Sequence, residues 1–145
     1  MALDIEAKWG ASVAKRGFAQ IPNYLLLINQ FLDEEHKLSP VESLVIIQLV
    51  ASWWRKDENP FPSMGMLAKR AGVSERQVQR AIGKLEKSGF IKRSKRKTKG
   101  IIQANSYDMN GTVQILNEIA AKFPNLYERN ITRSVTPISD PTSTL

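Results

Sequence analysis

A chain of 145 residues with 42% hydrophobic residues is long enough for one packed domain with flanking segments. It has no cysteine and a single histidine, His36, which excludes disulfides, thiol catalysis and metal sites built from thiolates or several histidines. Its net charge of +7 is uneven, because residues 67–107 carry twelve Lys and Arg side chains against two acidic ones, whereas the segments on either side are slightly acidic.

Residues 1–16 are predicted to form an N-terminal arm. The segment mixes Asp4, Glu6 and Lys8 with apolar residues, which is unlike a signal peptide, so we expect a cytoplasmic protein. The arm has no strong hydrophobic period, but Trp9 is costly to leave in water. We therefore expect the arm either to fold back on the domain or to pair with a second copy.

Two helices are predicted between the arm and the middle of the chain. Asn23 is placed to cap a short helix of about ten residues. Ser39, Pro40 and Glu42 combine a capping serine, a proline in the first turn and a glutamate three residues after the serine, which is a strong start signal. The helix that they start should run to about Trp54. Its apolar residues cover more than half of its circumference, which is typical of the central helix of a small domain.

A polar linker is predicted after this central helix. Residues 56–60 are charged or break regular structure, so we expect them to be mobile, with Phe61 and Pro62 anchoring their far end. The side chains of Trp53 and Trp54 are able to stack on nucleic-acid bases, but their place in a core-like helix favours burial.

Two short helices in a fixed relation are predicted over residues 63–88. Ser63 caps the first helix, and Gly72 ends it. Ser74, with Gln77 three residues later, starts the second helix by reciprocal capping. Because so few residues separate them, the two helices must cross steeply. One face of the second helix is basic, and the opposite face is apolar, with Val78, Ala81, Ile82 and Leu85.

A basic hairpin is predicted where the second helix ends, at Gly89. Residues 90–93 read as a strand, residues 95–100 as a turn rich in Lys and Arg, and residues 101–107 as the return strand. The return strand ends at Tyr107, whose side chain we expect in the core. The pattern as a whole predicts a mainly α fold with a small β-hairpin, in which a helix-turn-helix is followed by a wing.

An amphipathic helix is predicted over residues 110–125, with Thr112 as its cap and Pro124 as its end. Its apolar stripe must be covered either by its own domain or by the same helix of a second subunit, which would make a homodimer. Residues 126–145 contain too few apolar side chains to offset the entropy of ordering, so we expect a disordered tail. The stripe consists of Val113, Leu116, Ile119, Ala120 and Phe123.

The spacing of Ala68, Gly72 and Val78 resembles the bacterial helix-turn-helix pattern. A longer stretch, roughly residues 17–109, is similar to the winged helix-turn-helix domains of phage and plasmid replication and regulatory proteins. This resemblance implies a module that reads a DNA sequence, extended here by extra N- and C-terminal helices. Gly83 departs from a regular helix, because glycine inside a helix costs about 1 kcal/mol relative to alanine.

The side chains expected to contact DNA form two groups. A helix fits the major groove, where Arg can pair with guanine O6 and N7 and Gln with adenine N6 and N7. We expect base reading by Arg76, Gln77 and Arg80, which the resemblance also places in the recognition helix. Contacts to the DNA backbone are expected from Ser63, Ser74, Gln79, Lys84 and Lys87 and, in the wing, from Lys95, Arg96, Lys97 and Lys99. The alternative for each basic residue is a solvated surface side chain.

The sequence therefore favours specific binding of double-stranded DNA by a small transcriptional regulator, since a localised positive field attracts a phosphate polyanion. The alternative role is a plasmid or phage replication initiator or maintenance protein that binds origin repeats. A protein-interaction module with an acidic partner is a further alternative. No nucleophile–base pair and no phosphate-binding glycine loop indicates an enzyme, and no metal or cofactor is expected.

Overall fold

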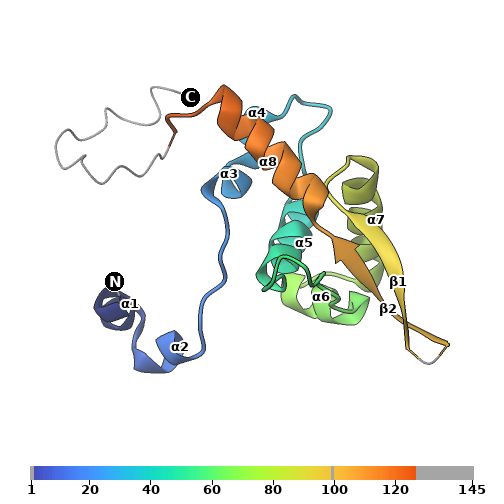
Figure 1. Ribbon diagram of the computed structural model, residues 1–145, viewed down its shortest axis with the longest axis horizontal. Coiled ribbons are helices and arrows are strands. Elements are labelled where there is room, and N and C mark those ends of the chain that lie inside the picture. The colour runs from blue at the N-terminus through green and yellow to red at the C-terminus, as the bar shows by residue number, and fades with distance from the viewer. Residues whose placement is uncertain (1, 99, 127–145) are drawn as a thin grey trace.

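The computed structural model describes residues 2–98 and 100–126, and for residues 2–3, 96–98 and 101–104 it describes the backbone only. Within the described residues the chain is mostly helical, with one antiparallel hairpin and additional helices at both ends (Figure 1), which confirms the predicted fold class. The elements are α1 Ala2–Trp9, α2 Ala11–Lys15, α3 Asn23–Leu26, α4 Ile28–Phe31, α5 Pro40–Ala51, α6 Met64–Ala71, α7 Glu75–Lys87, β1 Lys92–Thr98, β2 Ile101–Asp108 and α8 Asn110–Lys122.

Helix α5 begins as predicted but ends early. The Ser39 hydroxyl accepts a hydrogen bond from the backbone N–H of Glu42 at 3.2 Å, and the Glu42 carboxylate accepts one from the backbone N–H of Ser39 at 2.9 Å. The helix ends at Ala51, so the prediction that it runs to about Trp54 is wrong. Trp54 is 87% exposed and its indole N–H donates to the Ala51 carbonyl, whereas Trp53 is partly buried. The prediction of a buried Trp54 is therefore also wrong.

A single hydrophobic core lies among α5, α6 and α7, which pack side by side in Figure 1. Each helix contributes its apolar face, as expected for amphipathic elements of a small domain. The core includes Val45, Ile46 and Leu49 of α5, Leu67 and Ala68 of α6, and Val78, Ala81, Ile82 and Leu85 of α7. Residues that follow α7 also belong to it, namely Phe90, Ile91, Tyr107, Met109 and Ile119. The predicted burial of Tyr107 is confirmed.

The helix predicted from Asn23 is divided into α3 and α4. The break is at Leu27, whose backbone has φ −100° and ψ 10°. Asn23 does not cap the helix, because Pro22 occupies the N-cap position and no side chain caps α3. The amide of Asn29 instead donates to the carbonyl of Leu38 and accepts from its N–H, both at 2.8 Å. These two bonds hold α4 against the segment that leads into α5.

Helix α8 begins two residues before the predicted cap. Asn110 is its first residue, and the Asp108 carboxylate accepts a hydrogen bond from the Asn110 N–H at 2.8 Å. Thr112 is not the cap: it is buried, and its hydroxyl donates to the carbonyl of Phe90 at 2.8 Å. This threonine therefore joins α8 to the segment between α7 and β1, which a local capping pattern does not reveal.

The apolar stripe of α8 is covered largely by its own domain. Ile119 is 7% exposed, and Leu116 packs against the core. The ring of Phe123 lies 4.9 Å from the ring of Phe31 in α4, although Phe123 remains 43% exposed. Of the two alternatives for this stripe, the structure realises packing on the same chain for Leu116 and Ile119. A dimer contact through Val113 and Phe123 stays a prediction.

The segment predicted as a mobile linker is folded into a turn. Residues 55–58 form a turn closed by a backbone hydrogen bond of 3.1 Å and an isolated bridge. The carbonyl of Pro60 then accepts from the backbone N–H of Tyr107 at 2.9 Å, which joins this segment to β2. Pro62 is buried as expected, but Phe61, predicted to share in the anchoring, is 50% exposed.

The N-terminal arm, whose sequence shows no strong hydrophobic period, contains α1 and α2. None of residues 4–16 is buried, and Trp9 and Val13 of the arm, like Phe18 just after it, are each just over half exposed. Residues 17–22 lead from the arm to α3 without regular structure, and the arm stands away from the core helices in Figure 1. The predicted tail, residues 126–145, lies outside the described residues apart from Leu126.

Candidate nucleic-acid interface

The connection between α6 and α7 is set by two caps and one glycine. The Ser63 hydroxyl accepts from the Met66 N–H at 3.0 Å at the start of α6. Gly72 ends α6 with φ 71°, a left-handed conformation that favours glycine. The Ser74 hydroxyl accepts from the Gln77 N–H at 3.1 Å, and the Gln77 side-chain oxygen accepts from the Ser74 N–H at 3.0 Å. These predicted signals are confirmed, and they orient α7 across α6.

One face of α7 is buried and the opposite face is open. Val78, on the buried face, is 0% exposed. Arg76, Arg80 and Lys87 point away from the core and are exposed, as the helical period predicts. Within the described part of the chain, no hydrogen bond or ion pair occupies the side chain of Arg76 or Arg80. Both guanidinium groups are therefore free to bind an external partner.

The hairpin lies directly after α7, as predicted, but its strands are longer. Strand β1 pairs antiparallel with β2 from Lys92 opposite Asp108 to Thr98 opposite Ile101, and the register shifts between Lys95 and Lys97. The basic run assigned to a turn is thus mostly strand. Lys and Arg residues can extend the pairing of the two strands, because their long side chains are tolerated on a strand whose outer edge faces solvent. A register shift increases the local twist of the hairpin.

An ion pair ties the hairpin to α7. The Glu86 carboxylate accepts from the Arg93 backbone N–H at 3.1 Å and from two nitrogens of the Arg93 guanidinium at 3.1 and 2.9 Å. These hydrogen bonds, the one from the backbone N–H first, hold the pKa of Glu86 below its ordinary value of 4.5. Because Glu86 of α7 binds both the backbone and the side chain of Arg93 in β1, it fixes the orientation of β1 relative to α7. Glu86 is thus a positioning residue for the hairpin.

Residues 36–91 match a family model described as a helix-turn-helix domain. This segment is a helix-turn-helix domain. The match begins before α5 and ends just before β1, so the hairpin and the helices at both ends lie outside it. A helix-turn-helix domain implies DNA as a partner. No match was found among curated proteins.

Two negative findings apply to the part of the chain that the structure describes. No group of three or more His, Cys, Asp or Glu side chains could hold a metal ion. None of the helices formed by residues 2–98 and 100–126 combines the length and the apolar character needed to cross a membrane.

Gln77 and Gln79 differ in whether their side chains are already hydrogen-bonded within the fold. Because its oxygen takes part in the capping box with Ser74, Gln77 must give up that bond before it can pair with adenine through both ends of its amide. Gln79, assigned from sequence to the DNA backbone, is exposed and lies between Arg76 and Arg80 in the chain. Within the described residues no hydrogen bond engages its side chain. Among the described residues, Gln79 therefore has no side-chain hydrogen bond to give up before it binds a partner.

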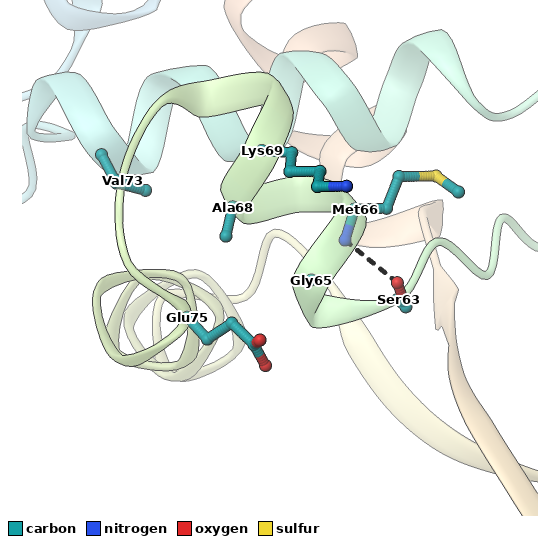
Figure 2. Close-up of a pocket in the computed structure, with 7 residues that line it drawn as sticks. All are labelled: Ser63, Gly65, Met66, Ala68, Lys69, Val73 and Glu75. Atoms are coloured by element: carbon teal, nitrogen blue, oxygen red, sulfur yellow. Dashed lines mark hydrogen bonds between the residues drawn. The ribbon is translucent and has the colours of Figure 1, made fainter.

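A groove of about 660 Å³ lies between α6 and the beginning of α7 (Figure 2). The predicted backbone contact Ser63 lines it, together with Lys69 and Glu75. Figure 2 shows that Lys69 comes from α6 and Glu75 from the first turn of α7. The Glu75 carboxylate opposes a phosphate at this edge, whereas the Lys69 ammonium favours one. Ser63 and Ser74 act first as helix caps, since both hydroxyls accept backbone hydrogen bonds.

The remaining predicted backbone contacts are divided between α7 and the hairpin that follows the helix-turn-helix domain. The Lys84 ammonium is 3.8 Å from the Glu42 carboxylate of α5, so Lys84 lies at the flank of α7 rather than on its open face. Lys87 and Lys95 are exposed. Arg96 and Lys97 lie in β1, where only their backbone is described, and Lys99 lies outside the described residues.

The Glu86 tether gives a testable pH dependence. Because the pKa of Glu86 is lowered by folding, its contribution to stability is complete above its ordinary pKa of 4.5 and is lost as the pH falls through the lowered value. We expect Glu86→Gln to weaken DNA binding several-fold at neutral pH, because the amide has no charge and only one acceptor oxygen for Arg93, so that β1 is held less firmly against α7. The variant should also lose less stability than the parent chain on acidification.

The matched control for this prediction is Glu118→Gln, which removes the same charge from the exposed side of α8. Thermal unfolding at several pH values and a binding titration measure both effects. Equal DNA affinity for Glu86→Gln and Glu118→Gln would show that the tether does not position the hairpin.

Proposed function

We propose that this chain is a cytoplasmic transcriptional regulator that binds one specific sequence of double-stranded DNA and acts by binding rather than by catalysis, without a cofactor. The observation that carries the proposal is the open face of α7. The guanidinium groups of Arg76 and Arg80 project from this face without a partner among the described residues, and α7 is the second helix of the helix-turn-helix motif formed by α6 and α7. In such domains the second helix enters the major groove of DNA.

The roles follow from the chemistry of each side chain. Arg76 and Arg80 each offer two parallel N–H donors to O6 and N7 of guanine, with Gln79 placed for adenine and Gln77 available only after its cap opens. Lys87 is a point charge suited to a phosphate. The hairpin, with Lys95, Arg96, Lys97 and Lys99, adds contacts to the backbone of the same duplex. The fixed angle of β1 to α7 supports simultaneous contact by both elements.

Salt dependence tests the proposal. With about six phosphate contacts, the logarithm of the binding constant should fall with the logarithm of salt concentration at a slope near −5, because each contact releases condensed counterions. A module that binds an acidic protein patch would show a much weaker dependence. A titration of labelled duplex at several salt concentrations measures the slope, and a flat line would contradict DNA binding.

Selection of bound sites from genomic DNA tests the biological role. A regulator should enrich single promoter sites, palindromic if two copies bind together. Clustered direct repeats would instead assign the chain to replication or maintenance of a plasmid or phage, the role that the sequence resemblance also allows. The reading face of α7 is the same for both roles, so this experiment separates them without testing DNA binding itself.

A further inference from the structure

The side-chain amide of Gln77 is held in one orientation by the capping box of α7. Its oxygen accepts a hydrogen bond from the backbone N–H of Ser74 at 3.0 Å and a second one from the Ser74 hydroxyl at 3.3 Å. The same hydroxyl accepts from the backbone N–H of Gln77 at 3.1 Å. Because a backbone N–H can only donate, the oxygen of the amide, and not its nitrogen, must face Ser74.

These two bonds use the full accepting capacity of the amide. A carbonyl oxygen has two lone pairs, and both are taken by Ser74. The amide nitrogen keeps its two N–H donors, and among the described residues no hydrogen bond engages it. Gln77 is exposed, so a partner can reach these donors. As long as the cap is closed, the Gln77 side chain can therefore donate hydrogen bonds to a partner but cannot accept them.

Gln77 lies on a flank of α7 rather than at the centre of its open face. Successive residues of a helix are rotated by about 100°, so Gln77 and Lys84, seven positions apart, point within about 20° of each other. Arg76 and Arg80 point about 60–100° away from Gln77 by the same count. The Lys84 ammonium lies 3.8 Å from the Glu42 carboxylate, so the negative charge on this side of α7 is compensated.

The flanks of a helix in the major groove face phosphates rather than bases. The groove is about 12 Å wide and a helix with its side chains is about 10–12 Å across, so the helix fills the groove from wall to wall. Side chains on its flanks therefore reach the phosphates of the two strands that form the walls. A phosphate offers only acceptor oxygens, which suit an amide that can only donate. Adenine requires an acceptor as well, which Gln77 would supply only with an open cap.

We propose that Gln77, with its cap closed, binds a phosphate of the DNA backbone and does not read adenine. The inference rests on the proposed function, since α7 must lie in the major groove. The capping box then has two roles, because it starts α7 and it also leaves both N–H groups of Gln77 for one wall of the groove. A phosphate contact carries no sequence information, but it fixes the position of α7 and so aligns Arg76 and Arg80 with the bases.

The variant Gln77→Glu separates the cap from the donors. Glutamate keeps an oxygen for the Ser74 N–H and is favoured in the first turn of a helix, so thermal stability should not fall. Its second oxygen and its negative charge replace the N–H donors and repel a phosphate. We expect affinity for the selected duplex to fall roughly tenfold or more, and by the same factor for every single-base variant of that duplex.

The matched control is Gln30→Glu, which makes the same chemical change at an exposed residue of α4. It should lower affinity by less than roughly threefold, through net charge alone. Equal affinities of Gln77→Glu and Gln30→Glu would overturn the proposal. A loss of thermal stability in Gln77→Glu would contradict the place of the Gln77 oxygen in the cap. A new preference of Gln77→Glu for cytosine at one position would show that residue 77 faces a base.

Replacing each phosphate of the duplex in turn by a neutral methylphosphonate locates the contact. At one phosphate the replacement should weaken binding of the parent chain several-fold but should not weaken binding of Gln77→Glu, because the hydrogen bond is already lost and the repulsion is removed. Equal losses for both chains at every phosphate would overturn the proposal. If Arg80→Ala still lowers affinity in that case, the proposed function stands and only the role of Gln77 is wrong.

Discussion

Replacing Arg80 with alanine is expected to weaken binding to the selected DNA site by about 1–3 kcal/mol, roughly 5- to 150-fold. The reason is geometric. Arg80 projects from the open face of α7 with no intramolecular partner among the described residues, so its removal should cost the fold little and would remove the proposed two-bond contact to guanine. The variant should also lose preference at one base position, which a comparison of single-base substitutions in the duplex measures.

The control is Arg55→Ala, because Arg55 is also an exposed arginine but lies in the turn after α5. It should leave affinity and base preference nearly unchanged, apart from a small effect of net charge. If Arg80→Ala and Arg55→Ala weaken binding equally and at every base position alike, Arg80 contributes charge only and the assignment of α7 as the reading helix is wrong.

Replacing Gly111 with alanine is expected to destabilise the fold by about 1–3 kcal/mol or more, because the added carbon has no space. A Cβ built at Gly111 would lie 2.0 Å from the carbonyl oxygen of Gly89 and 3.0 Å from that of Phe90. Both carbonyl oxygens belong to the backbone, so they cannot rotate away from the added carbon as a flexible side chain could. The start of α8 must therefore move, which also strains the hydrogen bond from Thr112 to Phe90. Chemical denaturation measures the loss.

Gly83→Ala is the matched control, since it adds the same methyl group to a helix. Nothing lies within 4 Å of a Cβ at Gly83, so α7 should become more stable by about 1 kcal/mol. Equal effects of Gly83→Ala and Gly111→Ala on stability would contradict the close approach of α8 to Gly89. A fall in DNA affinity for Gly83→Ala, together with the gain in stability, would place a DNA phosphate beside this glycine.

The parts of the fold that sequence could predict are those encoded by a few neighbouring residues. Helix caps and helix ends depend on side chains and conformations within four positions, so a short stretch of sequence is enough to predict them. Examples are the caps at Ser39, Ser63 and Ser74 and the helix end at Gly72. The spacing of the apolar residues in α7 likewise predicts which side of the helix faces outward, and it correctly predicts that Arg76 and Arg80 are exposed.

The parts that sequence could not predict depend on contacts between distant segments. Thr112 looks like a local cap, but its hydroxyl bonds to Phe90, twenty-two positions earlier. Glu86 looks like an ordinary exposed acid, and only the fold brings it to Arg93. The apolar run before Trp54 predicts that this residue continues the helix into the core, because no local signal shows that α5 ends at Ala51. Such outcomes are set by tertiary packing rather than by propensity.

The central claim is that the open face of α7 reads guanines in the major groove, and guanine N7 is the atom that tests it most directly. The measurement is the affinity of the parent chain and of Arg80→Ala for the selected duplex with 7-deazaguanine, which lacks the N7 acceptor, at each guanine in turn. At one position the substitution should weaken binding of the parent chain several-fold and leave binding of Arg80→Ala unaffected, since the contact is already absent. Unchanged affinity of the parent chain at every guanine would contradict the claim.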